Sequence, residues 1–278
     1  MTDVYLEKMD SQLGLDDVNL GRIPLYSGPP ELSRGQPVAK LRGTQMTPEN
    51  HEYRDPGPDD LRSPCPFVNA MANHGYIHRD GKQITWWAIT KAIVEVYHFS
   101  YPLAGLLAAS GVWTSLTQAW NPFYFDLEQI RTHKPYLVEH DASLTRANYP
   151  GDNWHPDPSI INELIAQASS PEGVSYQDFA RHRIAQEAKL SYKLSLPRHI
   201  LATGEIGLII PSLGRGDPLP DALHRKISIP WIKSFFHDAR LPSDWTRPKD
   251  ELTLKQVNDI ATEVRKQMAQ DREAGKDK

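Results

Sequence analysis

The sequence contains a single cysteine, Cys65, in 278 residues. An internal disulfide is therefore impossible, which favours a reducing compartment. The sequence also lacks an Asn-x-Ser/Thr sequon and a basic, apolar leader at its start, so we expect an intracellular protein. No apolar run reaches the length of a membrane span, and the longest, residues 101–113, predicts a buried core helix. We expect no membrane partner.

Charge is nearly balanced, with 31 Lys and Arg against 35 Asp and Glu and a net charge of −4. A basic footprint for nucleic acid is absent, so no nucleic-acid partner is expected. Hydrophobic residues make up 39% and charged residues 24% of the chain, as in ordinary globular proteins. The length is sufficient for one domain with a sizeable core.

Alternation typical of strands is scarce, and internal repeats are absent. We therefore predict an all-α fold with a single, mainly helical domain over residues 61–250. Residues 1–60 are rich in Pro, Gly and charge and predict an extended N-terminal arm, while residues 251–278 predict a polar C-terminal helix and charged tail. Within the domain, the predicted helical segments are 66–74, 84–99, 102–120, 159–169, 175–194, 198–214 and 229–239.

Cys65 lies between two prolines, immediately before one of these helices. Pro66 suits a first helical turn, because its missing N–H would have no partner within the helix. Cys65 then falls at the N-cap, where the N–H groups of Phe67 and Val68 point back at its sulfur. These donors and the positive helix end favour a thiolate. Gly75 is placed to end the helix.

Three functions for this thiol remain open on the residues alone. A buried structural cysteine is one, since free cysteine often serves as a small hydrophobic residue. A nucleophile is the second, although no partner base is near in the sequence. A metal ligand is the third. A lone thiolate does not make a zinc site, but it is a good axial ligand for haem iron.

The segment VEHDASLTR, residues 138–146, gathers oxygen and imidazole groups in a short loop. Glu139, His140, Asp141 and Ser143 offer carboxylate, carbonyl and hydroxyl oxygens that suit a hard cation such as Mg²⁺ or Mn²⁺. The alternative is a solvated acidic turn.

Glu205 is a lone carboxylate in the apolar helical run LATGEIGLII, residues 201–210. Burial there should raise its pKa, and such a group is a natural acid–base catalyst. The alternative is a helix glutamate turned towards water.

In combination, PCPFVNAMANHGYIHRDGK (residues 64–82) followed by EHDASLTR (residues 139–146) resembles the haem-thiolate peroxidase family. This family includes chloroperoxidase and the unspecific aromatic peroxygenases. The resemblance extends from about residue 55 to about residue 245, and it implies a helical haem domain of the chloroperoxidase type.

The resemblance implies haem b as cofactor, with Cys65 as the proximal thiolate ligand of its iron and the Phe67 and Val68 N–H groups beside the sulfur. It also implies a divalent cation, Mg²⁺ or Mn²⁺, bound next to a haem propionate. The cation ligands would be Glu139, Ser143 and the backbone carbonyl of His140.

In the same family a distal glutamate moves the proton of hydrogen peroxide, and Glu205 is its counterpart here. Glu172 and Glu187 are rivals, but one lies in a loop and the other on a charged helix face. In the family the residue that follows the counterpart of Glu139 is His or Gly. Where it is His, its side chain orients the distal catalytic glutamate, and where it is Gly, an arginine upstream on the distal glutamate's helix does so. The resemblance thus implies that His140 orients Glu205. His140 therefore indicates the chloroperoxidase and short-peroxygenase branch.

The expected distal pocket is aliphatic, because Val138 and Leu208 stand where relatives carry aromatic residues. Leu106 and Leu107 are further candidates for its wall. The resemblance thus predicts a peroxygenase or peroxidase that uses hydrogen peroxide to hydroxylate, epoxidise or oxidise small apolar or aromatic molecules. Halide oxidation by a halogenating enzyme is the alternative, and a non-catalytic haem-binding protein is a third. We expect a role in secondary metabolism. With Cys65 on iron, a non-covalent homodimer is the remaining way to dimerise.

Overall fold

Helices make up most of the structure. The computed structural model describes residues 51–134, 137–215 and 221–276. Its α-helices are α2 (Pro66–Asn73), α3 (Trp86–Tyr97), α4 (Tyr101–Ala119), α5 (Pro158–Ala166), α6 (Tyr176–Glu187), α7 (Leu196–Leu213), α8 (Ile229–Ile232) and α9 (Leu254–Lys276). The 3-10 segments η1 (Leu127–Arg131) and η2 (Asp221–His224) and the π-helical turn η3 (Lys233–His237) lie between them. The predicted mainly helical fold is confirmed, while most of the predicted arm, residues 1–60, falls outside the described residues.

Side chains that suit a helix start set most of the helix boundaries. The hydroxyls of Thr85 and Ser100 accept backbone N–H groups at the starts of α3 and α4, and the Asp157 carboxylate does so for α5. Ser175 and Asp178 form a reciprocal capping box on α6. These local signals explain why the sequence predicts the first turns well.

Three predicted helical segments differ from the structure at their ends. The segment 84–99 is helical only over α3, because Ile84 and Thr85 pair with another strand instead. The segment 175–194 stops being helical after Glu187, because most of residues 188–195 are exposed and find no core to pack against. The segment 229–239 divides into α8 and the π-helical turn η3, whose Phe235 ring packs against Phe67 of α2.

A small antiparallel sheet closes one side of the fold. Strand β1 (Ile84–Thr85) pairs with β2 (Tyr124–Phe125), so that Ile84 faces Phe125 across the ladder. Phe125 also lies against α4 at Gly111, where an added Cβ would come within 2.6 Å of its ring. The sheet therefore fixes α4 to the start of α3.

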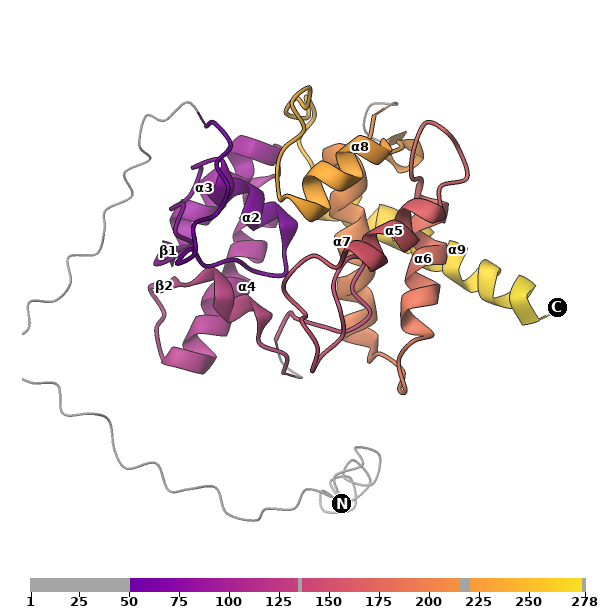
Figure 1. Ribbon diagram of the computed structural model, residues 1–278, viewed down its shortest axis with the longest axis horizontal. Coiled ribbons are helices and arrows are strands. Elements are labelled where there is room, and N and C mark those ends of the chain that lie inside the picture. The colour runs from indigo at the N-terminus through magenta and orange to yellow at the C-terminus, as the bar shows by residue number, and fades with distance from the viewer. Residues whose placement is uncertain (1–50, 135–136, 216–220, 277–278) are drawn as a thin grey trace, which may run out of the picture. The chain divides into compact units, whose positions relative to one another are not determined.

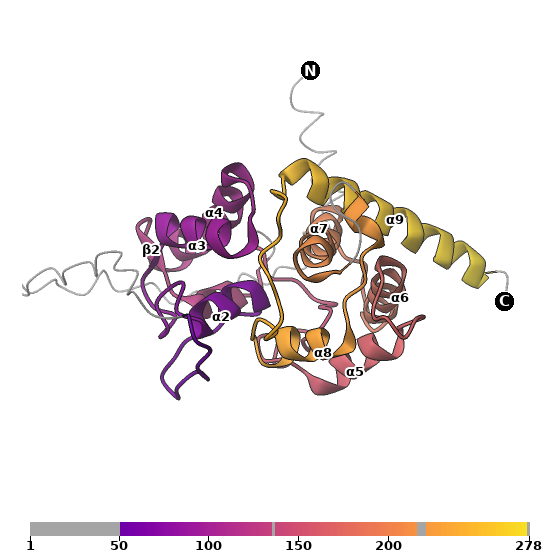
Figure 2. The same ribbon diagram turned by 90° about the horizontal axis from the view of Figure 1, so that it is seen from above.

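Figures 1 and 2 both place α2, α3 and α4 on one side of the helical domain and α5 to α9 on the other. An aromatic cluster joins the two sides. The Phe67 ring lies 4.8 Å from that of Tyr97 and 5.0 Å from that of Phe235 in η3. The Tyr97 hydroxyl donates to the Phe67 carbonyl at 2.9 Å. Phe67, two residues after Cys65, thereby anchors the first turn of α2 in the core.

Helix α9 packs along α7 and α6, as Figure 2 shows. At Gly207 of α7 an added Cβ would lie 2.5 Å from the Val257 carbonyl oxygen, so the two helices approach closely there. Buried residues of α9 that face this contact are Val257, Ile260, Ala261, Val264 and Met268. The residues that the structure describes all belong to one compact unit, 42–278.

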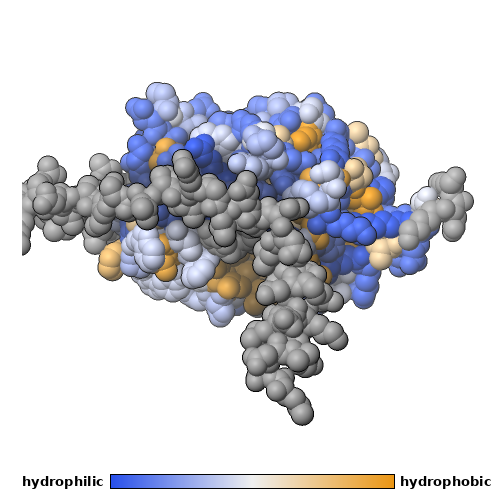
Figure 3. All heavy atoms as spheres, turned by 90° about the horizontal axis from the view of Figure 1, so that it is seen from below, coloured by the Kyte–Doolittle hydropathy of each residue, from blue (hydrophilic) through white to orange (hydrophobic). Residues whose placement is uncertain are grey.

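On the face in Figure 3, the described residues are mostly polar, with small apolar areas among them. Among the described residues, no helix combines the length and the apolar character needed to cross a membrane.

Candidate active site

Cys65 is held by a short hydrogen-bonded bracket in front of α2. It is the N-cap residue, with φ −80° and ψ 115°. The Asn69 side chain accepts from the Ser63 N–H at 2.9 Å and donates to the Ser63 carbonyl at 2.7 Å. The Ser63 hydroxyl accepts the Cys65 N–H at 3.1 Å. Ser63 and Asn69 therefore set where the sulfur points, a role that the sequence did not reveal because it depends on a turn of the chain.

The backbone N–H groups of Val68 and Phe67 act to lower the pKa of the Cys65 thiol, although neither makes a capping hydrogen bond to the sulfur. Burial nevertheless raises the pKa of the Cys65 thiol, and the charge of Glu205 raises it further, against the opposing charge of Arg146. The two donors favour the thiolate, as the sequence predicts, but the net shift of the Cys65 pKa is upward. Burial in apolar surroundings outweighs the two donors, and a cation at the sulfur is needed to favour the anion.

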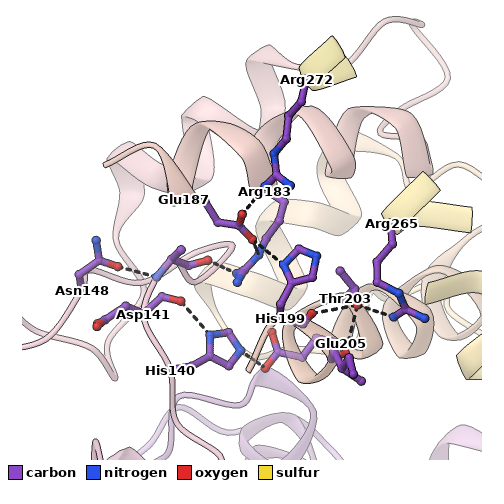
Figure 4. Close-up of polar contacts among 12 residues, drawn as sticks. His140, Asp141, Asn148, Arg183, Glu187, His199, Thr203, Glu205, Arg265 and Arg272 are labelled. Carbon is purple, nitrogen blue, oxygen red and sulfur yellow. Dashed lines mark hydrogen bonds and ion pairs between the residues drawn. The ribbon is translucent and has the colours of Figure 1, made fainter. Parts of the chain in front are cut away.

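Glu205 lies on α7, and its Oε1 is 3.5 Å from Nε2 of His140 (Figure 4). About 44% of its side chain is accessible. The predicted rise in its pKa is wrong. Burial does push the pKa of Glu205 upward, but the charges of His140, Arg183 and Arg146 outweigh burial and lower it. Glu205 is thus a carboxylate at neutral pH, which suits a group that first accepts a proton as a general base.

His140 is oriented by its own loop. Its Nδ1–H donates to the Asp141 carbonyl at 2.8 Å, which leaves Nε2 facing Glu205. Burial lowers the pKa of His140, but the charge of Glu205 more than compensates and the net shift is upward. Each member of the pair therefore stabilises the charged form of the other.

Asp141 braces this loop through its carboxylate. The carboxylate accepts the Tyr149 N–H at 2.7 Å and the Tyr192 hydroxyl, and His133 Nε2 lies 3.1 Å away. All of its close partners are donors from the protein. Asp141 therefore serves the loop's conformation.

Glu139 is a partly buried carboxyl with two hydrogen-bond donors from its own neighbourhood. Its Oε1 accepts from Asn153 and its Oε2 from the His140 N–H, both at 2.7 Å. Burial raises the pKa of Glu139 to about 7. Ser143 lies four residues on, and its hydroxyl accepts the Thr145 N–H at 3.3 Å. In the described part of the chain no three His, Cys, Asp or Glu residues form a metal cluster, so a cation here would rely on hydroxyl and carbonyl oxygens.

Arg146 is a functional candidate that sequence reasoning missed. It is buried, its Nη1 donates to the Thr145 hydroxyl and its Nε lies 3.4 Å from the Trp154 carbonyl. Its Nη2 has no hydrogen-bond partner among the described residues. Burial lowers the pKa of Arg146 to about 10, so the group remains charged, and its charge interacts with Cys65, Glu205 and Glu139. A buried guanidinium with a spare N–H fits a carboxylate of a bound group.

A cavity of about 580 Å³ lies beside this loop. Its lining includes Asn153, which donates to Glu139, and Trp154, whose ring is 3.9 Å from the Arg131 guanidinium. The lining does not include Cys65 or Glu205, so this cavity is distinct from the place where those two groups interact.

The predicted pocket residues vary in their surroundings. Val138 and Leu107 are partly buried, Leu208 is partly buried one turn beyond Glu205, and Leu106 is 55% exposed on α4. No described contact tests their role, which stays a prediction.

The rival glutamates are engaged elsewhere. Glu187 binds Arg183, His199 and Arg272, and the exposed Glu172 pairs with Lys226.

Comparison with known proteins identifies the family. The family model described as "Peroxidase, family 2" matches residues 51–250. The chain belongs to this peroxidase family. It is similar to an aromatic peroxygenase of Coprinellus radians, 28% identical over 232 residues, which are 74% of this chain and 86% of that protein. It is equally similar to a chloroperoxidase of Leptoxyphium fumago, 28% identical over 238 residues, which are 76% of this chain and 61% of that protein.

A shorter match is to the dothistromin biosynthesis peroxidase of Dothistroma septosporum, 40% identical over 65 residues, 23% of this chain and 16% of that protein. The resemblance to haem-thiolate peroxidases is thus confirmed. The chain is a haem peroxidase, an oxidoreductase that acts with hydrogen peroxide.

Proposed function

We propose that this peroxidase oxygenates or oxidises small apolar or aromatic molecules with hydrogen peroxide, using Cys65 as iron ligand and Glu205 as acid–base. The observation that carries the proposal is the convergence of four groups from three distant segments of the chain. The charges of Glu205 and of Arg146 both act on the Cys65 thiol, and Glu205 is paired with His140.

These residues fit a haem. Cys65 would supply the sulfur ligand for the iron. Burial raises the pKa of its thiol, and the positive charge of the iron would lower that pKa and favour the thiolate. The unpartnered Nη2 of Arg146 supplies a donor for a haem carboxylate. A bound haem would supply the two electrons that reductive cleavage of the peroxide O–O bond requires, and would hold the resulting oxidising equivalents for the organic substrate.

The side chains of this protein then handle the proton. Glu205, ionised at neutral pH, takes the proton from one oxygen of hydrogen peroxide and delivers it to the other, which leaves as water. The His140 imidazole holds the Glu205 carboxylate in place during both transfers, because its Nδ1–H is fixed to the Asp141 carbonyl.

Orientation by histidine, as in the chloroperoxidase and short-peroxygenase branch, is supported by the position of Arg198. This is the one arginine upstream of Glu205 in α7, and its Nη2 donates to the Lys134 carbonyl at 2.9 Å. It is therefore engaged outside the pair, whereas His140 faces Glu205.

We also propose a divalent cation, Mg²⁺ or Mn²⁺, held by Glu139, Ser143 and the His140 carbonyl. The support is chemical: a partly buried carboxyl with a pKa raised to about 7 gains from a cation, and the three groups offer hard oxygen ligands.

An organic substrate is favoured over halide by the apolar surroundings of the proposed pocket. Val138, Leu208, Leu106 and Leu107 are aliphatic, and α4, which carries the last two, contains no charged residue. The halogenating reaction remains the second candidate because one relative is a chloroperoxidase.

The biological setting is a separate proposal. The match to a peroxidase of dothistromin biosynthesis supports a role in secondary metabolism, and the single cysteine supports an intracellular location. Accumulation of the native protein in culture medium would contradict that location. A non-covalent homodimer is testable by sedimentation, where a purely monomeric species would exclude it.

The test of the reaction uses ¹⁸O-labelled hydrogen peroxide with a small aromatic hydrocarbon, with and without bromide. We expect labelled oxygen in a hydroxylated product, independent of bromide. Halogenation of an acceptor without oxygen transfer would establish the halogenating alternative. Haem binding with neither product would establish a non-catalytic protein.

A further inference from the structure

Helix α9 lies beyond the residues matched by the family, yet two of its arginines reach the supports of the site (Figure 4). Arg265 donates to the Thr203 hydroxyl at 2.8 Å, two residues before Glu205 on α7. Arg272 pairs with the Glu187 carboxylate at the end of α6. The helix therefore contacts both elements that stand behind the His140–Glu205 pair.

Glu187 connects three helices through one carboxylate. Its side chain is 16% exposed. Arg183 Nε and His199 Nδ1 each lie 3.1 Å from its Oε1, and Arg272 binds its Oε2. These partners fix the position of the Glu187 carboxylate, which in turn fixes the buried guanidinium that it pairs with. Loss of the carboxylate would leave that buried positive charge uncompensated.

Arg183 is that buried cation. Its side chain is fully buried on α6, and its Nη1 donates to the Ala142 carbonyl. Ala142 has φ +57°, a left-handed conformation that is costly for a residue with a Cβ. Its N–H donates to the Asn148 side-chain oxygen at 2.7 Å. Side chains therefore bind both the N–H and the carbonyl of Ala142.

Ala142 follows His140 by two residues, in the loop that presents the imidazole to Glu205. Fixing the Ala142 carbonyl therefore fixes the approach of His140. Figure 4 shows the sequence of contacts from Arg272 through Glu187 and Arg183 to this loop, with His140 and Glu205 next to it.

We propose that Arg183, held by Glu187 and Arg272, is a positioning residue for the His140–Glu205 pair, and that α9 thereby supports the peroxide reaction. The proposal rests on the acid–base function proposed for Glu205.

The test compares three variants of the haem-loaded enzyme. Arg183→Met keeps the aliphatic stem and removes the guanidinium. Arg272→Met removes the α9 partner of Glu187. Lys266→Met is the matched control, since Lys266 also lies on α9 but pairs with Glu263 at the surface. Each is measured for the second-order rate constant with hydrogen peroxide, KM for the organic substrate, the reduced carbon-monoxide spectrum and the thermal midpoint.

For Arg183→Met we expect a loss of about tenfold to a hundredfold in the peroxide rate constant, as for groups that orient a ligand or catalytic side chain. KM for the organic substrate and the reduced carbon-monoxide band should stay unchanged. Arg272→Met should show a smaller loss of the same kind, and Lys266→Met none.

A wild-type peroxide rate constant in folded Arg183→Met, with only a lower thermal midpoint, would overturn the proposal by showing a purely structural role. If Arg183→Met does not fold, Arg272→Met decides, and an unchanged rate constant there overturns it. Glu205→Gln separates the two levels: if this variant also reacts normally with peroxide, the proposed function itself has failed.

Discussion

Nε2 of His140 and Oε1 of Glu205 lie 3.5 Å apart, although the two residues are separated by two helices in the chain. Their pKa shifts run in opposite directions, as expected for an ion pair: the pKa of Glu205 is lowered and the pKa of His140 is raised. This coupling supplies an ionised base whose charge also acts on the Cys65 thiol.

Replacing His140 by phenylalanine should raise the pKa of Glu205. Burial already pushes this pKa upward, and without the imidazole only Arg183 and Arg146 oppose it. The base form is lost as pH falls through that pKa, so the acid limb of the peroxide rate constant should move to higher pH. Stopped-flow rates across a pH series measure this. His155→Gln, at an exposed histidine paired with Asp152, is the control, and an unmoved acid limb in His140→Phe would contradict the coupling.

Cation binding should strengthen as pH rises through about 7. Burial raises the pKa of Glu139 to about 7, and only the carboxylate binds a divalent cation. A carboxyl pKa raised on folding means that, without the cation, Glu139 contributes stability that is lost as pH rises from its unfolded value towards 7. Chelation should therefore lower the thermal midpoint strongly at pH 8 and little at pH 5.5. Equal effects of chelation at both pH values would contradict the cation site. An effect in the wild type no larger than that in Glu139→Gln would also contradict it.

Arg146→Met should weaken haem binding while leaving the fold intact. The Arg146 Nη2 is unpartnered in the described structure, so its removal breaks few protein contacts but deletes the donor proposed for a haem carboxylate. Haem transfer to apomyoglobin measures the loss rate, which we expect to rise on the order of tenfold, the effect of about 1.4 kcal/mol. Arg131→Met, which removes a cation stacked on Trp154, serves as control. Equal haem retention in both variants would remove Arg146 from the site.

Two glycines of α7 should respond oppositely to alanine. At Gly207 a Cβ would meet the Val257 carbonyl oxygen at 2.5 Å, so Gly207→Ala should destabilise the protein by about 1–3 kcal/mol through overpacking. At Gly204 nothing lies within 4 Å, and Gly204→Ala should stabilise it by about 0.5–1 kcal/mol through helix propensity. Denaturant unfolding measures both. Equal effects would mean that α7 and α9 do not pack as described.

Local features of the structure were predictable because they depend on neighbouring residues. Pro66 after Cys65 predicts the start of α2, and Gly75, with φ +73°, ends it as expected. The blocks around Cys65 and Glu139 likewise carry the family resemblance in a few adjacent residues. Periodicity of apolar residues then suffices for the mainly helical class.

The errors lie where distant residues meet. The pKa of Glu205 shifts opposite to the prediction because three cations from other segments, His140, Arg183 and Arg146, approach it. The local sequence LATGEIGLII gives no indication of these three cations. The pKa of the Cys65 thiol likewise depends on burial by the rest of the fold, which outweighs the donors of its own helix.

The central claim, that Cys65 ligates haem iron, is tested most directly by the absorption spectrum of the reduced, carbon-monoxide-bound protein beside Cys65→Ser. We predict a strongly red-shifted Soret band in the wild type that vanishes in the variant. The same band in both proteins, at the position typical of histidine ligation, would contradict the account.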